Sequence, residues 1–198
     1  IRFLKEEIQE LYYEKAPLVS KSLAAIIKTL MVKRLESSFN AFKISINNLL
    51  VATNHMIEMF EKGKIFIAPD LNINSLMEKG MSMDEIEELI IELSAENPKN
   101  NVFAPDDFDP AFLDGLHRDL KNLHELKDQW AKVTVDPKLE NFIDLLKNEV
   151  FRKDLNPTGK LVIFTESTDT ADYLEENLEK HDFRKVLSVS SKNRNKTF

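Results

Sequence analysis

Most of this sequence, up to about residue 150, has the hydrophobic periodicity of amphipathic α-helices. Apolar residues recur there every three or four positions in successive segments, which places them on one face of an α-helix. The chain has only 4 glycines and 7 prolines among 198 residues, fewer than an all-β protein or an enzyme with glycine-rich phosphate loops usually carries. The sequence therefore predicts a mainly α-helical fold.

The first helical stretch spans residues 17–62. Two amphipathic segments are expected in it, because two apolar stripes are separated by Ser37 and Ser38. Serine competes for backbone hydrogen bonds and favours helix caps, so this pair predicts a kink or a restart. Gly63 is suited to end the second helix. A short β-like run, residues 64–68, follows it.

Three further helices are expected after that run. Ser82 and Glu85 form a capping-box pattern that opens a helix ending near residue 97. Residues 100–107 are expected to form a loop. Two Asp-Pro pairs, at positions 109–110 and 136–137, then mark helix starts, because proline suits the first helical position. The resulting helices reach Trp130 and Val150.

The pattern changes after a turn at residues 156–159. Residues 161–164, Leu-Val-Ile-Phe, form a continuous apolar run, typical of a strand buried on both faces. Asp169 can cap a following helix, and residues 186–189 resemble a second strand, which together predict a βαβ unit. The expected organisation is a helical region, residues 1–132, followed by the opening of an α/β lobe, residues 133–198.

Composition excludes several classes of function. There are no cysteines, so disulfides and thiolate metal sites are excluded, and a reducing, cytoplasmic location is expected. The longest apolar stretch, residues 23–32, is too short to span a bilayer, so no membrane partner is expected. The net charge of -7 argues against a self-sufficient nucleic-acid-binding module.

Three segments resemble blocks of bacterial Swi/Snf-like superfamily II helicases, and they occur in the order found in that family. The first, Leu30–Ser38 with Ala41-Phe42, contains the run Lys-Arg-Leu-Glu-Ser-Ser found between the two motor lobes. The second, Asp136–Leu139 with Leu145-Leu146, resembles the lead-in to the second RecA-like lobe. The third, Lys160–Ala171, is similar to helicase motif IV and its helix, although Ser167 stands where the family usually has an aromatic residue.

The resemblance implies a parent protein that is a DNA-dependent ATPase, with ATP and Mg²⁺ held between two RecA-like lobes. This chain would be its inter-lobe helical region and the start of the second lobe, with both ends as boundaries of a piece. The sequence contains no Gly-x-x-x-x-Gly-Lys-Ser/Thr loop or acidic magnesium motif, so we expect the piece to be inactive alone and to hold no cofactor itself. Its expected partners are nucleic acid, with DNA favoured, and the first RecA-like lobe.

Candidate nucleic-acid-binding residues fall in three groups. A basic patch in the first helical stretch could contact phosphates, although the structural interpretation, a solvated helix face or Arg34 bridging the two lobes, is preferred. Hydroxyls after the predicted strand could bind phosphate oxygens or could merely cap the next helix. Basic residues near the end of the sequence could extend the track or form an exposed tail. The candidates are Lys33, Arg34, Lys43, Thr165, Ser167, Thr168, Lys192 and Arg194.

Other functional interpretations are weaker. His117 and His124 are separated by about 10 Å along a helix, too far for one metal ion. Residues 106–109 lack the glycine and the terminal glutamate of a calcium loop. No arrangement of nucleophile, base and oxyanion site points to a free-standing hydrolase. The main alternative is a helical protein-interaction module attached to an unrelated α/β domain.

Overall fold

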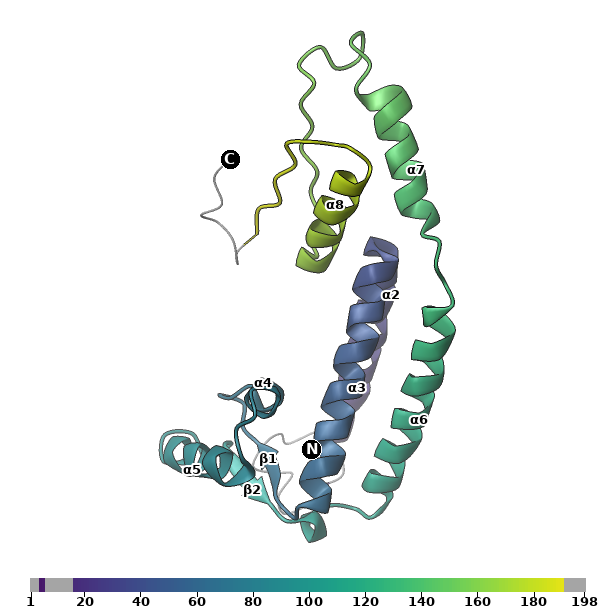
Figure 1. The fold of residues 1–198 in the computed structure, drawn as a ribbon. Helices are drawn as coiled ribbons and strands as arrows, with labels where there is room; N and C mark the ends of the chain where they lie inside the picture. Colours follow the sequence, from purple (N-terminus) through teal and green to yellow (C-terminus); the bar gives the residue numbers. More distant parts are fainter. Residues whose placement is uncertain (1–3, 6–15, 191–198) are drawn as a thin grey trace. The chain divides into compact units, whose positions relative to one another are not determined.

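We describe a computed structural model of the chain, which covers residues 4–5 and 16–190, with side chains from residue 24 onward and at residues 4–5. Helices dominate it, as the sequence predicts (Figure 1). The elements, in chain order, are α2 (Ala16–Ser37), α3 (Phe39–Glu61), β1 (Ile65–Ile67), α4 (Ile73–Glu78), α5 (Met83–Ser94), β2 (Asn101–Phe103), a 3-10 turn (Pro105–Asp107), α6 (Ala111–Ala131), α7 (Pro137–Leu145), a π-helical turn (Leu146–Val150) and α8 (Thr168–Lys180).

The chain divides into two compact units. The first contains residues up to Lys28 and Ile46–Asp128, and the second contains Thr29–Ser45 and the residues from Gln129 onward. Helices α2, α3 and α6 therefore contribute to both units. Within the described part of the chain, no helix combines the length and apolar character needed to cross a bilayer.

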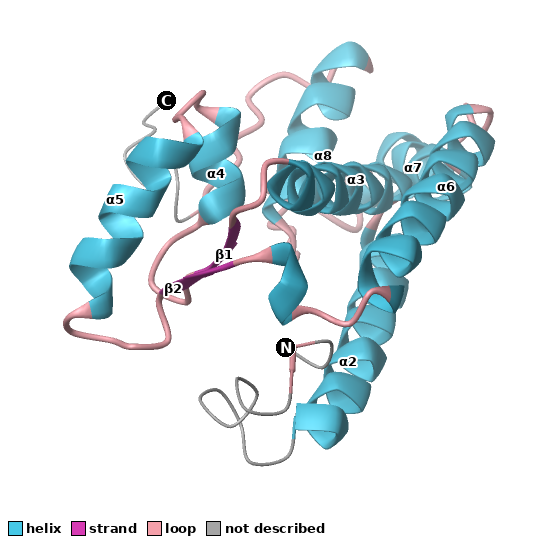
Figure 2. Ribbon diagram, turned by 90° about the horizontal axis from the view of Figure 1, so that it is seen from below, coloured by secondary structure: helices cyan, strands magenta, loops and turns pink. Residues whose placement is uncertain are grey.

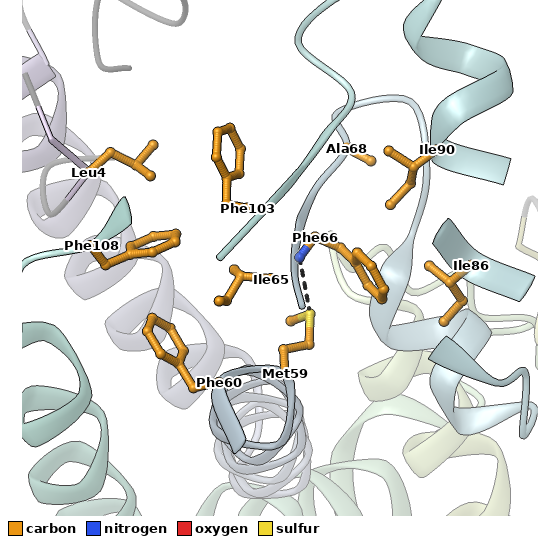
Figure 3. Packing of buried hydrophobic residues seen from close by; sticks show 10 residues of the cluster. All are labelled: Leu4, Met59, Phe60, Ile65, Phe66, Ala68, Ile86, Ile90, Phe103 and Phe108. Carbon is orange, nitrogen blue, oxygen red and sulfur yellow. Dashed lines mark hydrogen bonds between the residues drawn. The ribbon is translucent and has the colours of Figure 1, made fainter. Parts of the chain in front are cut away.

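The first unit is built on a two-stranded antiparallel sheet, drawn in magenta in Figure 2. Ile65 lies opposite Phe103 in the register of β1 and β2. The side chains around this sheet form the core shown in Figure 3, where the backbone N–H of Phe66 donates to Met59 Sδ at 3.4 Å. The buried members of the core are Leu4, Met59, Phe60, Ile65, Phe66, Ala68, Ile86, Ile90, Phe103 and Phe108.

Several predicted helix boundaries are confirmed in this unit. Gly63 follows α3 with a φ of 77°, and its N–H donates to the carbonyl of Phe60, as expected of a helix stop. Ser82 and Glu85 form the predicted capping box at the start of α5. The predicted loop at residues 100–107 was wrong, because β2 and the 3-10 turn form there. Strand β2 exists because β1 supplies its hydrogen-bonding partner.

The second unit contains a small apolar cluster around α7 and α8. Its buried members are Ile143, Leu146 and Leu178, from α7, the π-helical turn and α8, and Ala41 and Phe42 of α3 are also buried in this unit. Phe39 and Phe42 of α3 both contact Trp130 edge-to-face, with ring centroids 5.1 and 4.9 Å apart. The predicted helix start at Pro137 is confirmed, and in the first unit the helix predicted to start at Pro110 begins one residue later, at Ala111.

The two predicted strands of the second unit do not form. Neither residues 161–164 nor residues 186–189 form a strand, and the first of these runs is exposed rather than buried, with Phe164 92% exposed. A strand needs a hydrogen-bonding neighbour, and no described segment pairs with either run. The helix between them, α8, forms as predicted.

Candidate functional site

The break between α2 and α3 is the centre of the candidate site. Ser38 lies between the two helices and is only 5% exposed. Its Oγ accepts the N–H of Ala41 at 3.0 Å, and its carbonyl accepts the N–H of Phe42. Ser38 is therefore the N-cap of α3, and the predicted restart of the helix at this serine pair is confirmed.

Thr170 of α8 contacts both serines of the break. Its Oγ1 lies 2.7 Å from Ser37 Oγ and 3.1 Å from Ser38 Oγ. Thr170 and Ser38 are each 5% exposed, whereas Ser37 is half-buried. Because an unpaired buried hydroxyl is costly, these three groups stabilise one another's positions.

Arg34, one turn before the break, makes three polar contacts. Its Nε donates to Ser45 Oγ at 2.9 Å, its Nη1 donates to Ser167 Oγ at 2.6 Å, and its Nη2 forms an ion pair with Asp169. About a quarter of the side chain of each ion-pair partner remains exposed, 27% for Arg34 and 26% for Asp169. The planar guanidinium thereby joins α2, α3 and the start of α8.

Ser167 caps α8. Its Oγ accepts the N–H of Thr170 at 3.3 Å in addition to the contact from Arg34. The prediction that Asp169 caps this helix was wrong, because Asp169 lies inside the first turn, where its carboxylate pairs with Arg34. A negative charge in that turn also interacts favourably with the helix dipole.

Lys138 of α7 completes the polar network. Its ammonium group donates to the carbonyl oxygen of Glu36 and, at 3.2 Å, to that of Ser37. These are carbonyls of the last turn of α2, which lack helical partners, and a cation is favoured at that end. Nearby, the Tyr173 hydroxyl donates to Asp136 Oδ2 at 3.4 Å, and burial together with the Asp136 charge raises the pKa of Tyr173.

The remaining candidate residues lie in different surroundings. Lys43 Nζ donates to the carbonyl of Val133 at 2.7 Å, whereas Lys33 is exposed. Thr165 is exposed and its Oγ1 accepts the N–H of Ser167 at 3.2 Å, while Thr168 is half-buried. Lys192 and Arg194 lie outside the described residues.

A cavity of about 440 Å³ adjoins the network in the second unit. Its walls are mainly apolar and include Phe142, Ile163 and Leu174, and Ser37, Ser38 and Thr170 are also among its lining residues. Much of the space beside the network is therefore not filled by side chains.

The polar side chains of the site position one another through hydrogen bonds and an ion pair. Among the side chains that the structure describes, no group of three or more potential metal ligands occurs. Sequence reasoning placed Arg34 and Ser167 at the site but missed Ser45, Lys138 and Thr170. The Ser-Ser pair was a usable signal, because a buried cap next to a helix break needs a polar partner from another segment.

No protein-family model matches the chain, and no curated protein or solved structure matches it.

Proposed function

We propose that this chain is part of a Swi/Snf-like superfamily II motor, an ATP-dependent nucleic-acid translocase or helicase. In that protein it would form the helical region between the motor lobes and the opening of the second RecA-like lobe. The region would brace the two lobes and contribute to the nucleic-acid track. ATP and Mg²⁺ would be bound by other parts of the parent, because this sequence lacks a phosphate loop.

One observation carries the proposal. The three segments that resemble the helicase family are separated by up to 135 positions, yet their side chains meet in one polar network. Arg34 and the two serines come from the first segment, Lys138 from the second, and Thr170 from the third. A chance resemblance of three short runs gives no reason for those runs to contact one another.

The network also suggests how the candidate residues divide their roles. Arg34 and Ser167 are engaged with each other, so they suit a bracing role between α2 and α8. Lys33 and Thr165 are exposed and are available to a phosphate backbone. The proposed track therefore uses the exposed members, held in place by the engaged ones.

A second candidate function has support from α2. Ile26 and Ile27 of α2, in the first unit, are each about half exposed, and Leu30 and Val32 of the same helix, in the second unit, are exposed to a similar extent. Exposed apolar patches commonly mark protein contacts. A helical protein-interaction module without motor activity would account for this surface.

The test uses the full-length product of the gene. Its ATP hydrolysis is measured with and without duplex DNA, and the proposal predicts hydrolysis that DNA stimulates. A full-length protein that lacks both ATP binding and DNA-stimulated hydrolysis would leave the interaction module as the better account. In parallel, the 198-residue chain alone should show no ATP binding by calorimetry and only weak DNA binding at physiological salt, given its net charge of -7.

A further inference from the structure

We propose that the break between α2 and α3 is a hinge, which contacts with the Thr170 hydroxyl and the Lys138 ammonium group hold in its closed conformation. Removing either contact should open residues 37–42 locally while the first unit stays folded. This inference concerns the mobility of the chain itself and does not depend on the proposed motor function.

The break between α2 and α3 leaves backbone groups that need hydrogen-bonding partners. The last carbonyls of α2 and the first amides of α3 have no helical partners. Lys138 Nζ donates to two of these carbonyls, and Ser38 Oγ accepts the N–H of Ala41. The α2 end of the break is therefore held by a side chain from a helix about 100 positions away.

The two serines of the break share one hydrogen-bonding partner, the Thr170 hydroxyl. Ser38 Oγ accepts from Ala41, so its own proton is free to be donated to Thr170 Oγ1, and the proton of Thr170 can then be donated to Ser37 Oγ. This chain of hydrogen bonds runs from α3 through α8 to α2. Because each bond polarises the next, loss of the central hydroxyl weakens the contacts on both sides.

The two sides of the break differ in packing. On the α3 side, Ala41 is fully buried and Phe42 packs on Trp130. On the α2 side, Leu30 and Val32 are about half exposed. Little apolar burial therefore opposes movement of the α2 end, and the polar contacts hold it.

The experiment measures amide hydrogen exchange in the 198-residue chain and in three variants with substitutions in α8. Thr170→Val keeps the shape and removes the hydroxyl, Thr170→Ser keeps the hydroxyl, and Thr168→Val is the matched control in the same turn of α8. We expect amides of residues 38–42 to exchange roughly five- to thirtyfold faster in Thr170→Val, equivalent to about 1–2 kcal/mol at 1.4 kcal/mol per tenfold. Thr170→Ser and Thr168→Val should match the unaltered chain.

The amides of residues 86–90 in α5 report on the first unit and should not change. Lys138→Met, which removes the other contact, provides an independent variant and should speed exchange in residues 36–42 in the same way. Unchanged exchange at residues 38–42 in Thr170→Val and Lys138→Met would overturn the hinge. Faster exchange throughout the chain, including residues 86–90, would also overturn it, because the hydroxyl would then serve general stability.

Discussion

Each of the two units of this chain is stabilised internally by a different kind of interaction. The first surrounds a small sheet with ten buried side chains, nearly all of them large and apolar (Figure 3). Among the described residues of the second, three buried apolar side chains cluster around α7 and α8, and Ala41 and Phe42 are buried on α3. A network of hydroxyls, one guanidinium and one ammonium group lies in the same unit.

This difference affects how each unit responds to change. Apolar burial is roughly proportional to area and tolerates small shifts, whereas a polar network depends on each donor finding its acceptor. The first unit should therefore lose stability in proportion to the volume removed from its core. The stability of the second unit should be sensitive to the removal of single polar atoms.

The largest effect should come from the core of the first unit. Ile90 is 1% exposed, and its neighbour Ile91 on the same helix is 60% exposed. Ile90→Ala should lower the free energy of unfolding by about 2–5 kcal/mol, because it removes buried methyl groups and leaves a cavity. Ile91→Ala should change it by less than about 0.5 kcal/mol. Urea titrations of both variants check this, and equal losses would show that the core is not where the structure places it.

In the second unit, Arg34 should have the largest effect. Arg34→Ala removes three contacts and leaves Ser167 and Asp169 without their cationic partner. Hydrogen bonds to charged groups contribute about 1.5–3 kcal/mol. The ion pair is partly exposed and therefore screened, so we expect a loss of about 1–2 kcal/mol. The exposed neighbour Lys33, changed to alanine, is the control and should have almost no effect. A neutral result for Arg34→Ala would mean that the network contributes no stability.

The two units also differ in how well the sequence predicts them. In the first unit, the stop at Gly63 and the cap at Ser82 depend on neighbouring residues, so local patterns suffice. Strand β2 was missed because its three residues carry little pattern and depend on pairing with β1. Pairing of that kind is a tertiary effect that a propensity does not contain.

In the second unit, the same limit acts in the opposite direction. The apolar run at residues 161–164 predicts a buried strand, but no described segment supplies a partner and the run stays exposed. Arg34 was a candidate from its charge alone, whereas its partners Ser45 and Asp169 depend on how the helices pack. The assignment of Lys33 and Thr165 to a nucleic-acid track stays a prediction.

A cap in the first unit should have an intermediate effect. Ser82 Oγ accepts the N–H of Glu85, and the Glu85 carboxylate accepts the N–H of Ser82 at 2.8 Å. Ser82→Ala should cost about 1 kcal/mol, because it leaves an orphan amide at the start of α5. Ser82→Asp keeps an acceptor and should restore most of the loss. Thermal melting of the pair checks this, and a cost for Ser82→Asp as large as that for Ser82→Ala would argue against capping.

Acid should reveal a smaller effect at Asp70. Hydrogen bonds from Asn100 and Asn97 hold the pKa of the Asp70 carboxyl below its usual value of 3.8. A group whose pKa is lowered by folding contributes stability above its unfolded pKa and loses it as the pH falls through its folded pKa. Stability should therefore decline below about pH 4, and Asp70→Asn should flatten part of that decline. The exposure of Asp70 keeps the effect small, and an unchanged acid limb in urea titrations at pH 2–5 would contradict it.

The smallest effect on stability should come from Thr165, which makes it the cleanest test of the nucleic-acid track. Ser167 is buried and caps α8, so Ser167→Ala should cost about 1 kcal/mol. Thr165 is exposed and only accepts one amide, so Thr165→Ala should stay within about 0.5 kcal/mol of the unaltered chain.

In the full-length protein, Thr165→Ala should nevertheless weaken DNA stimulation of ATP hydrolysis by about fivefold at subsaturating DNA. That factor corresponds to one neutral hydrogen bond to phosphate, about 1 kcal/mol. Basal hydrolysis should not change, because ATP would be held elsewhere. Thr165→Ser, which keeps the hydroxyl, should retain full stimulation. If Thr165→Ala lost melting temperature and kept its stimulation, the turn would be a structural cap, and the exposed half of the proposed track would have to lie with Lys33.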